Sequence, residues 1–159
     1  MIDEKILSNV SAELKKQGVT IATAESCTGG LIAHILTNVS GSSDYFDRGI
    51  VSYSNKSKME LLDVSDELIK RFGAVSEEVA KAMAEGIRKK SNVDIGLATT
   101  GIAGPTGVTR EKPVGLVYIA VATSDDTVVR RFQFSGNRLE NKDSTCNAAL
   151  DMLLDCLKR

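Results

Sequence analysis

The sequence predicts an α/β protein: a three-layer α/β/α sandwich around a mixed, mostly parallel sheet of about five strands. Short segments rich in β-branched and apolar residues alternate with segments whose apolar residues recur every three or four positions. This alternation is typical of strands separated by helices. The last two strand segments are separated only by residues 124–126, a turn too short for a crossover helix, so they should form an antiparallel hairpin.

In the first part of the chain, Ile6, Val10 and Leu14 recur every four positions, which predicts an amphipathic helix. Asp3 is suited to cap the start of this helix and Gly18 to end it. The elements expected in this part are, in order, a helix at residues 3–17, a strand at 19–21, a helix at 31–39, a loop at 40–44 and a strand at 48–54.

In the rest of the chain, Ser76 is a favourable N-cap, and Glu77 and Glu78 suit the first turn of the helix that follows it. The elements expected here are a short helix capped by Asn55, a helix from Ser65 to near Gly73, a longer helix from Ser76, a strand at 93–99, a loop at 100–113, strands at 114–122 and 127–134, and a long helix from about Arg138.

Composition narrows the classes of function. We expect residues 1–159 to form one domain with a hydrophobic core, since 42% of residues are hydrophobic and 26% are charged. A net charge of -1 provides no basic surface for nucleic acid or an anionic membrane. No apolar run is long enough to cross a bilayer, and no signal peptide is evident. Three cysteines without an export signal lead us to expect a cytoplasmic protein with reduced thiols.

Metal binding and histidine-based catalysis are not expected. His34 is the single histidine, and its place inside an apolar helix favours a packed or half-exposed residue over a ligand or a triad base. Cys146 and Cys156 lie ten positions apart in one predicted helix, roughly 15 Å along its axis, so they should not share a metal ion. A nucleophile in this chain therefore needs another base.

Residues 22–30 carry the strongest catalytic pattern, a strand-to-helix turn rich in small and hydroxyl residues. Ser26 or Cys27 at such a turn is suited to act as a nucleophile, because the N–H groups at the start of a helix can stabilise an oxyanion. The alternative is structural: Ser26 or Thr28 simply caps the helix.

Tyr53 and Lys58 supply a second candidate group, at the end of a predicted strand and on the first turn of the next helix. Burial or a neighbouring cation could lower the pKa of Lys58 into the range of a general base for a serine nucleophile. The alternative is that Lys56 and Lys58 form a solvated helix face with Tyr53 packed beneath it.

The segment 100–105 resembles a loop that cradles phosphate, because Gly101 and Gly104 allow the backbone to approach a ligand closely. It matches neither a Walker A motif nor a dinucleotide fingerprint. Arg138, where a strand meets a helix, suits bidentate phosphate contact. The alternatives are a plain flexible loop and a surface arginine. If the strands before these loops are parallel, the loops should converge on one cleft at the carboxyl ends of the strands.

Taken together, these segments resemble the CinA C-terminal domain family, the nicotinamide-nucleotide amidases. The similarity follows the family's order over nearly the whole chain, at residues 23–30, 41–43, 53–55, 58, 73–77, 100–105, 111–115 and 134–136. The resemblance implies an α/β/α mixed-sheet fold and hydrolysis of the carboxamide of nicotinamide mononucleotide to nicotinate mononucleotide and ammonia, without a metal or organic cofactor.

The resemblance also implies roles for individual residues. Ser26 matches the nucleophile, Lys58 the base and Tyr53 the partner of the base. The positions expected to contact substrate are Cys27, Thr28 and Gly29, through backbone N–H groups, together with Thr100, Gly101, Gly104 and, for the phosphate, Arg138.

Residues 106–110 depart from the family's usual run of glycines, which affects the expected shape of this wall and the substrate preference. Longer relatives carry a further N-terminal domain, whose activity is not expected here. The expected partner is a small-molecule pyridine nucleotide, with no nucleic acid and no membrane, and a homo-oligomer is expected. A non-catalytic nucleotide- or phosphate-binding module and a magnesium-dependent phosphoryl-transfer enzyme are the alternatives.

Overall fold

Five strands form one sheet in the order β2-β1-β3-β4-β5 in the computed structural model, which describes residues 1–159. The strands are β1 Ile21–Glu25, β2 Phe46–Val51, β3 Ile95–Gly101, β4 Leu116–Ala122 and β5 Thr127–Gln133. The helices are α1 Glu4–Gln17, α2 Leu31–Thr37, α3 Asn55–Leu62, α4 Asp66–Phe72, α5 Glu77–Ser91 and α6 Arg138–Leu157, with a 3-10 turn at Ser42–Asp44.

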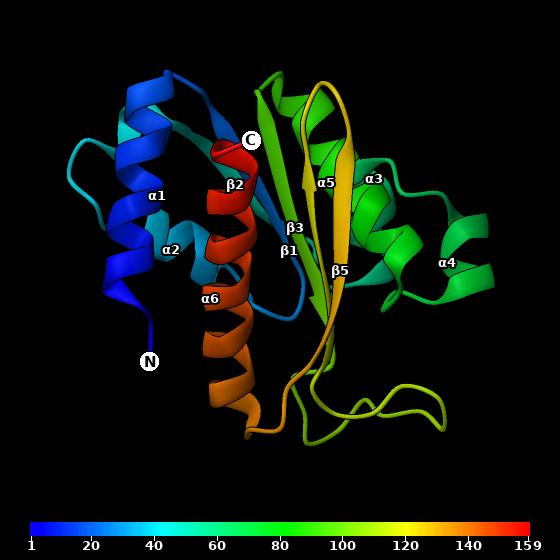
Figure 1. Ribbon diagram of the computed structural model, residues 1–159. Coiled ribbons are helices and arrows are strands. Elements are labelled where there is room, and N and C mark those ends of the chain that lie inside the picture. The colour runs from blue at the N-terminus through cyan, green and yellow to red at the C-terminus, as the bar shows by residue number, and fades with distance from the viewer.

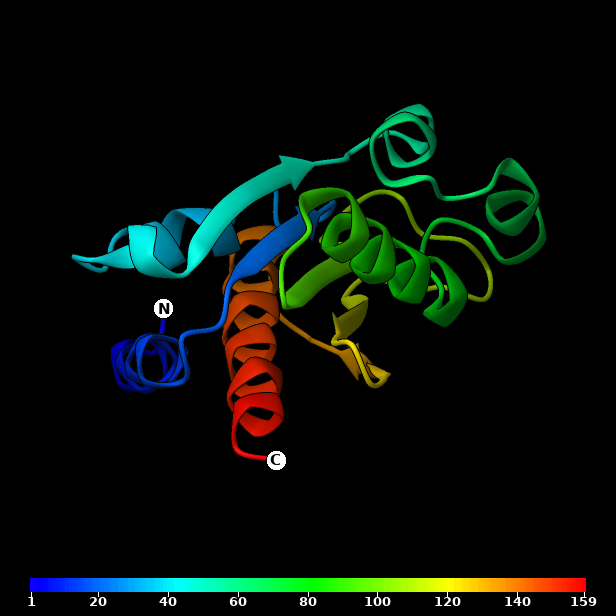
Figure 2. The same cartoon turned by 90° about the horizontal axis from the view of Figure 1, so that it is seen from above.

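Helices cover both faces of the sheet, as predicted. Figures 1 and 2 show α1, α2 and α6 on one face, and α5 with α3 and α4 on the other. The sheet is mixed: β1 pairs in parallel with β2 and β3, whereas β3–β4 and β4–β5 are antiparallel. The strand pairs are therefore divided evenly between the two types, although β4 alone runs against the other four strands.

The carboxyl ends of β1, β2 and β3 lie at one edge of the sheet. Glu25, at the end of β1, is in register with Val51 of β2 and Thr99 of β3. The turn after β1, the start of α3 and the loop after β3 therefore emerge side by side, which confirms the convergence predicted for parallel strands.

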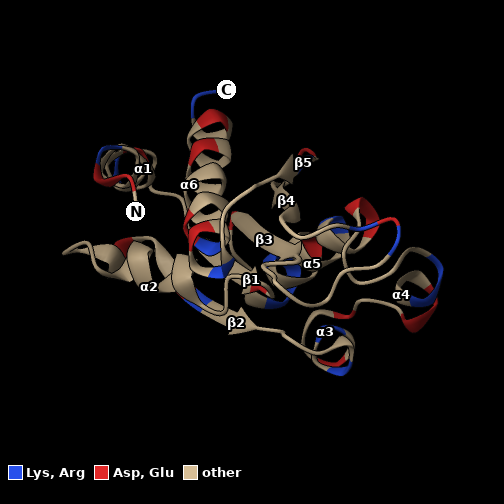
Figure 3. Ribbon diagram, turned by 90° about the horizontal axis from the view of Figure 1, so that it is seen from below, with Lys and Arg blue, Asp and Glu red and all other residues tan.

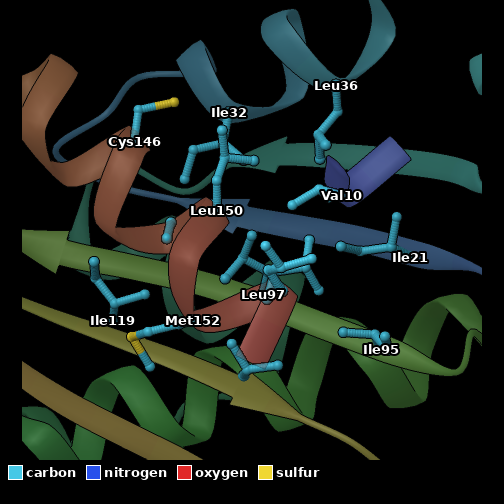
Figure 4. Packing of buried hydrophobic residues seen from close by; sticks show 14 of the residues in the cluster. Val10, Ile21, Ile32, Leu36, Ile95, Leu97, Ile119, Cys146, Leu150 and Met152 are labelled. Atoms are coloured by element: carbon cyan, nitrogen blue, oxygen red, sulfur yellow. The ribbon is translucent and has the colours of Figure 1, made fainter. Parts of the chain in front are cut away.

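The two faces of the sheet bury side chains of different size. Large aliphatic residues such as Ile21, Leu97 and Leu150 pack between the sheet and α1, α2 and α6 (Figure 4). The strand residues on the opposite face are mostly alanines, namely Ala22, Ala24, Ala98, Ala120 and Ala122. These small side chains leave room for α5 to lie close to the strands.

Several expected boundaries were wrong. The first strand is not at residues 19–21 but at Ile21–Glu25, so the first four residues of the expected turn at 22–30 are in fact strand. Because β1 is an interior strand and all its residues are buried, it has small side chains beneath close-packed helices in place of the large β-branched residues that mark most strands. The second strand is Phe46–Val51 rather than 48–54, and β3 extends through Thr100 to Gly101.

The cap of α3 also differs from the expectation. Ser54, not Asn55, is the N-cap, and it forms a reciprocal capping box with Ser57. The Ser54 hydroxyl accepts from the Ser57 N–H at 3.0 Å, and the Ser57 hydroxyl accepts from the Ser54 N–H at 3.1 Å. The helix that carries Lys58 therefore begins at a fixed position relative to the end of β2.

Candidate active site

Ser26 comes directly after the interior strand β1 and lines a cavity at the carboxyl ends of the strands. Its N–H donates to the Thr99 carbonyl at 3.1 Å, and its own carbonyl accepts from the Gly29 N–H at 3.1 Å. These two bonds fix the backbone on both sides of the side chain. Only 8% of the residue is exposed, which is enough for the hydroxyl to face the cavity while its backbone stays packed.

Lys58, on α3, lines the same cavity and contacts Ser26 directly. Its Nζ donates to Ser26 Oγ at 2.9 Å, to the Ser52 carbonyl at 2.8 Å and to the Tyr53 carbonyl at 3.2 Å. When the amine is neutral, the two carbonyls occupy its two N–H groups. Its lone pair is then left for the Ser26 hydroxyl, which is the geometry a general base requires.

The surroundings of Lys58 favour the neutral amine. The residue is 1% exposed, and desolvation lowers the pKa of its ammonium group from 10.5 to about 8. No carboxylate forms an ion pair with Lys58. The one opposing effect is that negative charge on Cys27 would raise the pKa of the lysine. Because the pKa lies near neutrality, an appreciable share of the amine is unprotonated at physiological pH. The alternative of a solvated Lys58 is wrong, whereas Lys56 is exposed and pairs with Glu60 at 3.7 Å.

The turn after Ser26 presents free backbone donors. The N–H of Gly29 is used in the bond to the Ser26 carbonyl, but those of Cys27 and Thr28 donate to no protein acceptor. Neither Ser26 nor Thr28 caps α2, since Gly30 occupies the N-cap position and makes no side-chain cap bond. The capping alternative is therefore wrong. Of the three N–H groups expected to stabilise an oxyanion, those of Cys27 and Thr28 are available, and that of Gly29 is not.

Tyr53 and Arg138 form a wall of the cavity on the solvent side. Arg138 Nη2 donates to Tyr53 Oη at 3.0 Å, and Nη1 donates to the Gly104 carbonyl at 2.7 Å. The Tyr53 hydroxyl thus contacts Arg138 rather than Lys58, and Tyr53 reaches the lysine only through its carbonyl. Two of the five guanidinium N–H groups are used in these bonds, which leaves three for a ligand.

The loop after β3 forms the remaining wall. The Thr100 hydroxyl donates to the Ala74 carbonyl at 2.8 Å, which ties the end of β3 to the segment before α5. At Gly101 a Cβ atom would lie 2.8 Å from the Leu116 carbonyl oxygen, so only glycine fits this close approach. Gly104 does not line this cavity but carries the carbonyl that holds Arg138.

The cavity has a volume of about 280 Å³. Its lining residues are Ser26, Cys27, Tyr53, Asn55, Lys58, Ala74, Val75, Thr100, Gly101, Ile102, Ala103, Thr106, Gly107 and Arg138. The cavity thus unites seven of the ten predicted site residues, whereas Thr28, Gly29 and Gly104 do not line it. Figure 3 views the molecule from this end and shows basic positions where α6 begins.

Two supporting residues were missed from the sequence. The buried carboxylate of Glu25 accepts the Ile32 and Ala33 N–H groups at the start of α2, at 2.9 and 3.0 Å. Asn141, 1% exposed on α6, donates to the carbonyls of Ala103 and Gly136 at 2.9 and 3.0 Å. No local motif marks either residue. Asn141 bonds to a loop distant along the chain, and Glu25 bonds to the start of a helix that begins six residues after it.

The remaining polar candidates lie elsewhere. His34 is exposed on α2, where it contacts Asn38, and it does not line the cavity. No group of three or more His, Cys, Asp or Glu side chains is arranged to hold a metal ion. None of the helices has both the length and the apolar character needed to span a bilayer.

Comparison with known proteins relates this chain to a family. Residues 3–157 match the CinA C-terminal domain. A Caldicellulosiruptor saccharolyticus protein named competence-damage inducible is 54% identical over 153 residues, 96% of this chain and 37% of that protein. A CinA-like protein of Syntrophus aciditrophicus is 51% identical over 152 residues, 95% of this chain and 36% of that protein. The chain thus spans little more than a third of the length of these curated relatives.

Solved structures show the same fold. The competence/damage inducible protein CihA from Agrobacterium tumefaciens superposes with a TM-score of 0.94 at 38% identity, covering 100% of this chain and 99% of that one. A CinA superfamily protein from Escherichia coli superposes with a TM-score of 0.91 at 30% identity, covering 98% of this chain and 94% of that one. None of these names states a reaction.

Proposed function

The chain belongs to the CinA C-terminal domain family, and from this premise we propose that it is an amidohydrolase acting on nicotinamide mononucleotide. Its products would be nicotinate mononucleotide and ammonia. The observation that carries the proposal is the 2.9 Å contact between Lys58 Nζ and Ser26 Oγ, made by a buried amine that no carboxylate neutralises. A nucleophile beside a base of suitably lowered pKa is the arrangement that acyl transfer requires.

The first half of the reaction forms an acyl-enzyme. Ser26 Oγ attacks the carboxamide carbon while neutral Lys58 takes the hydroxyl proton. The carbonyl oxygen becomes an oxyanion, for which the N–H groups of Cys27 and Thr28 are the available donors. When the intermediate collapses, the C–N bond breaks, the Lys58 ammonium returns the proton to the leaving nitrogen, and ammonia departs. The nicotinoyl group remains as an ester of Ser26.

The second half regenerates the enzyme. Water attacks the ester carbon and gives a proton to Lys58, and the same backbone donors receive the new oxyanion. The bond to Ser26 Oγ then breaks, and Lys58 returns the proton to that oxygen. The product leaves as a carboxylate.

Arg138 is the residue we propose for the phosphate. Its guanidinium is held in place by the Gly104 carbonyl and the Tyr53 hydroxyl, and it keeps three N–H donors free at the cavity. Tyr53, 59% exposed, lines the cavity, contacts Arg138 through its hydroxyl and Lys58 through its carbonyl, and is suited to contact the ribose or pyridine ring.

The test is an ammonia-release assay on nicotinamide mononucleotide, its dephosphorylated riboside and free nicotinamide, each with and without a chelator. We expect turnover of the mononucleotide, lost in Ser26→Ala and unaffected by chelation, with kcat/KM at least about tenfold lower for the other two compounds. Equal kcat/KM values for all three compounds would contradict the phosphate anchor. Binding of the mononucleotide without any turnover would contradict the amidase proposal and favour a nucleotide-binding module.

A further inference from the structure

Glu25 is a buried carboxylate for which the proposed chemistry has no use. It is 1% exposed and forms no ion pair. Three donors stabilise it instead. Its Oε1 accepts from the Thr28 hydroxyl at 2.6 Å and from the Ile32 N–H at 2.9 Å, and its Oε2 accepts from the Ala33 N–H at 3.0 Å. A carboxylate buried in this way is costly unless every such bond is made, so its position must be strongly fixed.

The carboxylate also sets the direction of a chain of hydroxyl groups. Glu25 Oε1 accepts the hydroxyl proton of Thr28, so the Thr28 oxygen is left as an acceptor. The Thr28 oxygen then accepts from the Thr99 hydroxyl, 2.8 Å away. Burial raises the pKa of the adjacent Cys27 thiol to about 12, so this side chain is uncharged at neutral pH. The chain of hydroxyl donors runs in one direction, from Thr99 through Thr28 to Glu25.

This chain holds the turn that follows the nucleophile. Thr99 contacts the residues on both sides of Cys27: its carbonyl accepts the Ser26 N–H at 3.1 Å, and its hydroxyl donates to the Thr28 hydroxyl at 2.8 Å. The Ser26 backbone and the Thr28 side chain are thus bonded to the strand behind them, while the N–H groups of Cys27 and Thr28 stay free of protein acceptors. Side-chain bonds fix this segment in place of the backbone bonds it lacks.

We infer that Glu25, acting through the hydroxyl groups of Thr28 and Thr99, is a positioning residue that holds the Cys27 and Thr28 N–H groups where an oxyanion forms. The inference rests on the proposed acyl transfer. Donors fixed before the reaction need no reorganisation as charge develops, so the loss of the chain should slow the chemical step and leave substrate binding unchanged.

The test compares three substitutions of buried threonines. Thr28→Val removes the hydroxyl that contacts Glu25 while keeping the volume, and Thr28→Ser restores the hydroxyl. Thr23→Val makes the same change two residues before Glu25, at a threonine that is 0% exposed and whose hydroxyl has no partner. We expect Thr28→Val to lower kcat about tenfold or more with KM within about twofold, and the other two variants to stay within about threefold of the wild type.

A second readout does not depend on the physiological substrate. Diisopropyl fluorophosphate reacts with an activated serine: Oγ forms a bond to phosphorus, fluoride leaves, Lys58 takes the proton, and the phosphoryl oxygen occupies the oxyanion position. The rate of labelling, followed by the mass of the intact protein, should fall about tenfold in Thr28→Val and be retained in Thr28→Ser and Thr23→Val.

The outcomes separate the inference from the proposed function. Labelling of the wild type without ammonia release would overturn the substrate while the labelling rates still test the positioning role. A folded Thr28→Val protein with wild-type kcat and labelling rate would overturn the positioning role alone. Thr99→Val removes the hydroxyl that donates to Thr28, so it should lower kcat and the labelling rate as Thr28→Val does. If Thr28→Val and Thr99→Val both unfold while Thr23→Val folds, the hydroxyl chain has a structural role and the inference is overturned. A wild-type protein that shows neither reaction overturns both.

Discussion

Lys58 is an amine enclosed by carbonyl groups, and its protonated state is the costly one. Desolvation lowers the pKa of the ammonium group to about 8. In the neutral amine the two N–H groups bond to the carbonyls of Ser52 and Tyr53, which directs the Nζ lone pair toward Ser26. A base of this kind works only when it has lost its proton. The proposed reaction should therefore follow the titration of this one side chain.

The rate of the proposed reaction should accordingly rise with pH. Below about pH 8 Lys58 is protonated and cannot accept the Ser26 proton, so kcat/KM should increase through an apparent pKa near 8 and level off above it. Lys58→Arg should lower kcat roughly a thousandfold, because guanidinium keeps its charge. The control is Lys56→Ala, at the exposed neighbour, which should match the wild type. Substantial activity in Lys58→Arg would assign Lys58 an electrostatic role only.

Ser26, not Cys27, should be the nucleophile. Burial raises the pKa of the Cys27 thiol to about 12, so at neutral pH it is a thiol rather than the reactive thiolate. Ser26→Ala should lower kcat at least about a thousandfold, whereas Cys27→Ala should retain most of the activity in the ammonia-release assay. If iodoacetamide abolished turnover of the wild type but not of Cys27→Ala, the thiol would lie close enough to block the site; turnover by Ser26→Ala would exclude the serine.

At the scale of the elements, the caps and apolar faces of the long helices could be predicted from sequence, because they depend on neighbours within one or two turns. Ser76 caps α5, and Val79, Met83 and Ile87 on its buried face are fully buried. Strand β1 could not be placed, because its identity depends on the helices and strands around it. Ala22 and Ala24 are poor strand formers that become suitable only beneath close-packed helices.

The candidate site divides in the same way. Ser26 and Lys58 could be proposed from their residue types and from the turn and helix start that carry them, and the fold brings them together. Glu25 and Asn141 could not, since a buried carboxylate or amide gives no sequence signal until the segments it binds are known. Thr28 donates to Glu25 instead of capping a helix because its hydroxyl also bonds to Thr99 on the neighbouring strand β3.

Asn141 should control the shape of the substrate wall. Its amide joins the Ala103 carbonyl to Gly136, so it connects the loop after β3 to the segment that begins α6 and carries Arg138. Asn141→Ala should raise KM about tenfold and lower the free energy of unfolding by about 1–3 kcal/mol, because buried polar groups lose their partners. Asn147→Ala, on the same helix but bonded to the N-terminal residues, is the control and should leave KM unchanged. An unchanged KM in Asn141→Ala would refute this role.

At the scale of the whole molecule, the catalytic lysine should lower the stability of the protein. Its pKa falls from 10.5 in the unfolded chain to about 8 in the fold, so the unfolded state binds more protons between these values. The wild type should therefore gain stability relative to Lys58→Met as the pH rises from about 8 to 10.5, by up to about 3 kcal/mol.

Urea denaturation of both proteins near pH 7 and near pH 10 measures this difference. Other groups titrate equally in the two proteins, so they cancel in the comparison. The gap between the free energies of unfolding should move in favour of the wild type at the higher pH. A gap that is the same at both pH values would mean that the Lys58 ammonium is accommodated in the fold without a penalty.

The catalytic pair and the groups that would hold the rest of the substrate come from separate stretches of the chain. The pair that would break the bond lies within residues 26–58, whereas the glycine loop and Arg138, which would hold the rest of the substrate, come from residues 100–138. Mutation can therefore reshape one wall while the other is inherited intact. A few substitutions near Thr106 and Gly107 can change which ligand binds while Ser26 and Lys58 are retained. After gene duplication, each copy would keep the same reactive pair and could bind a different ligand.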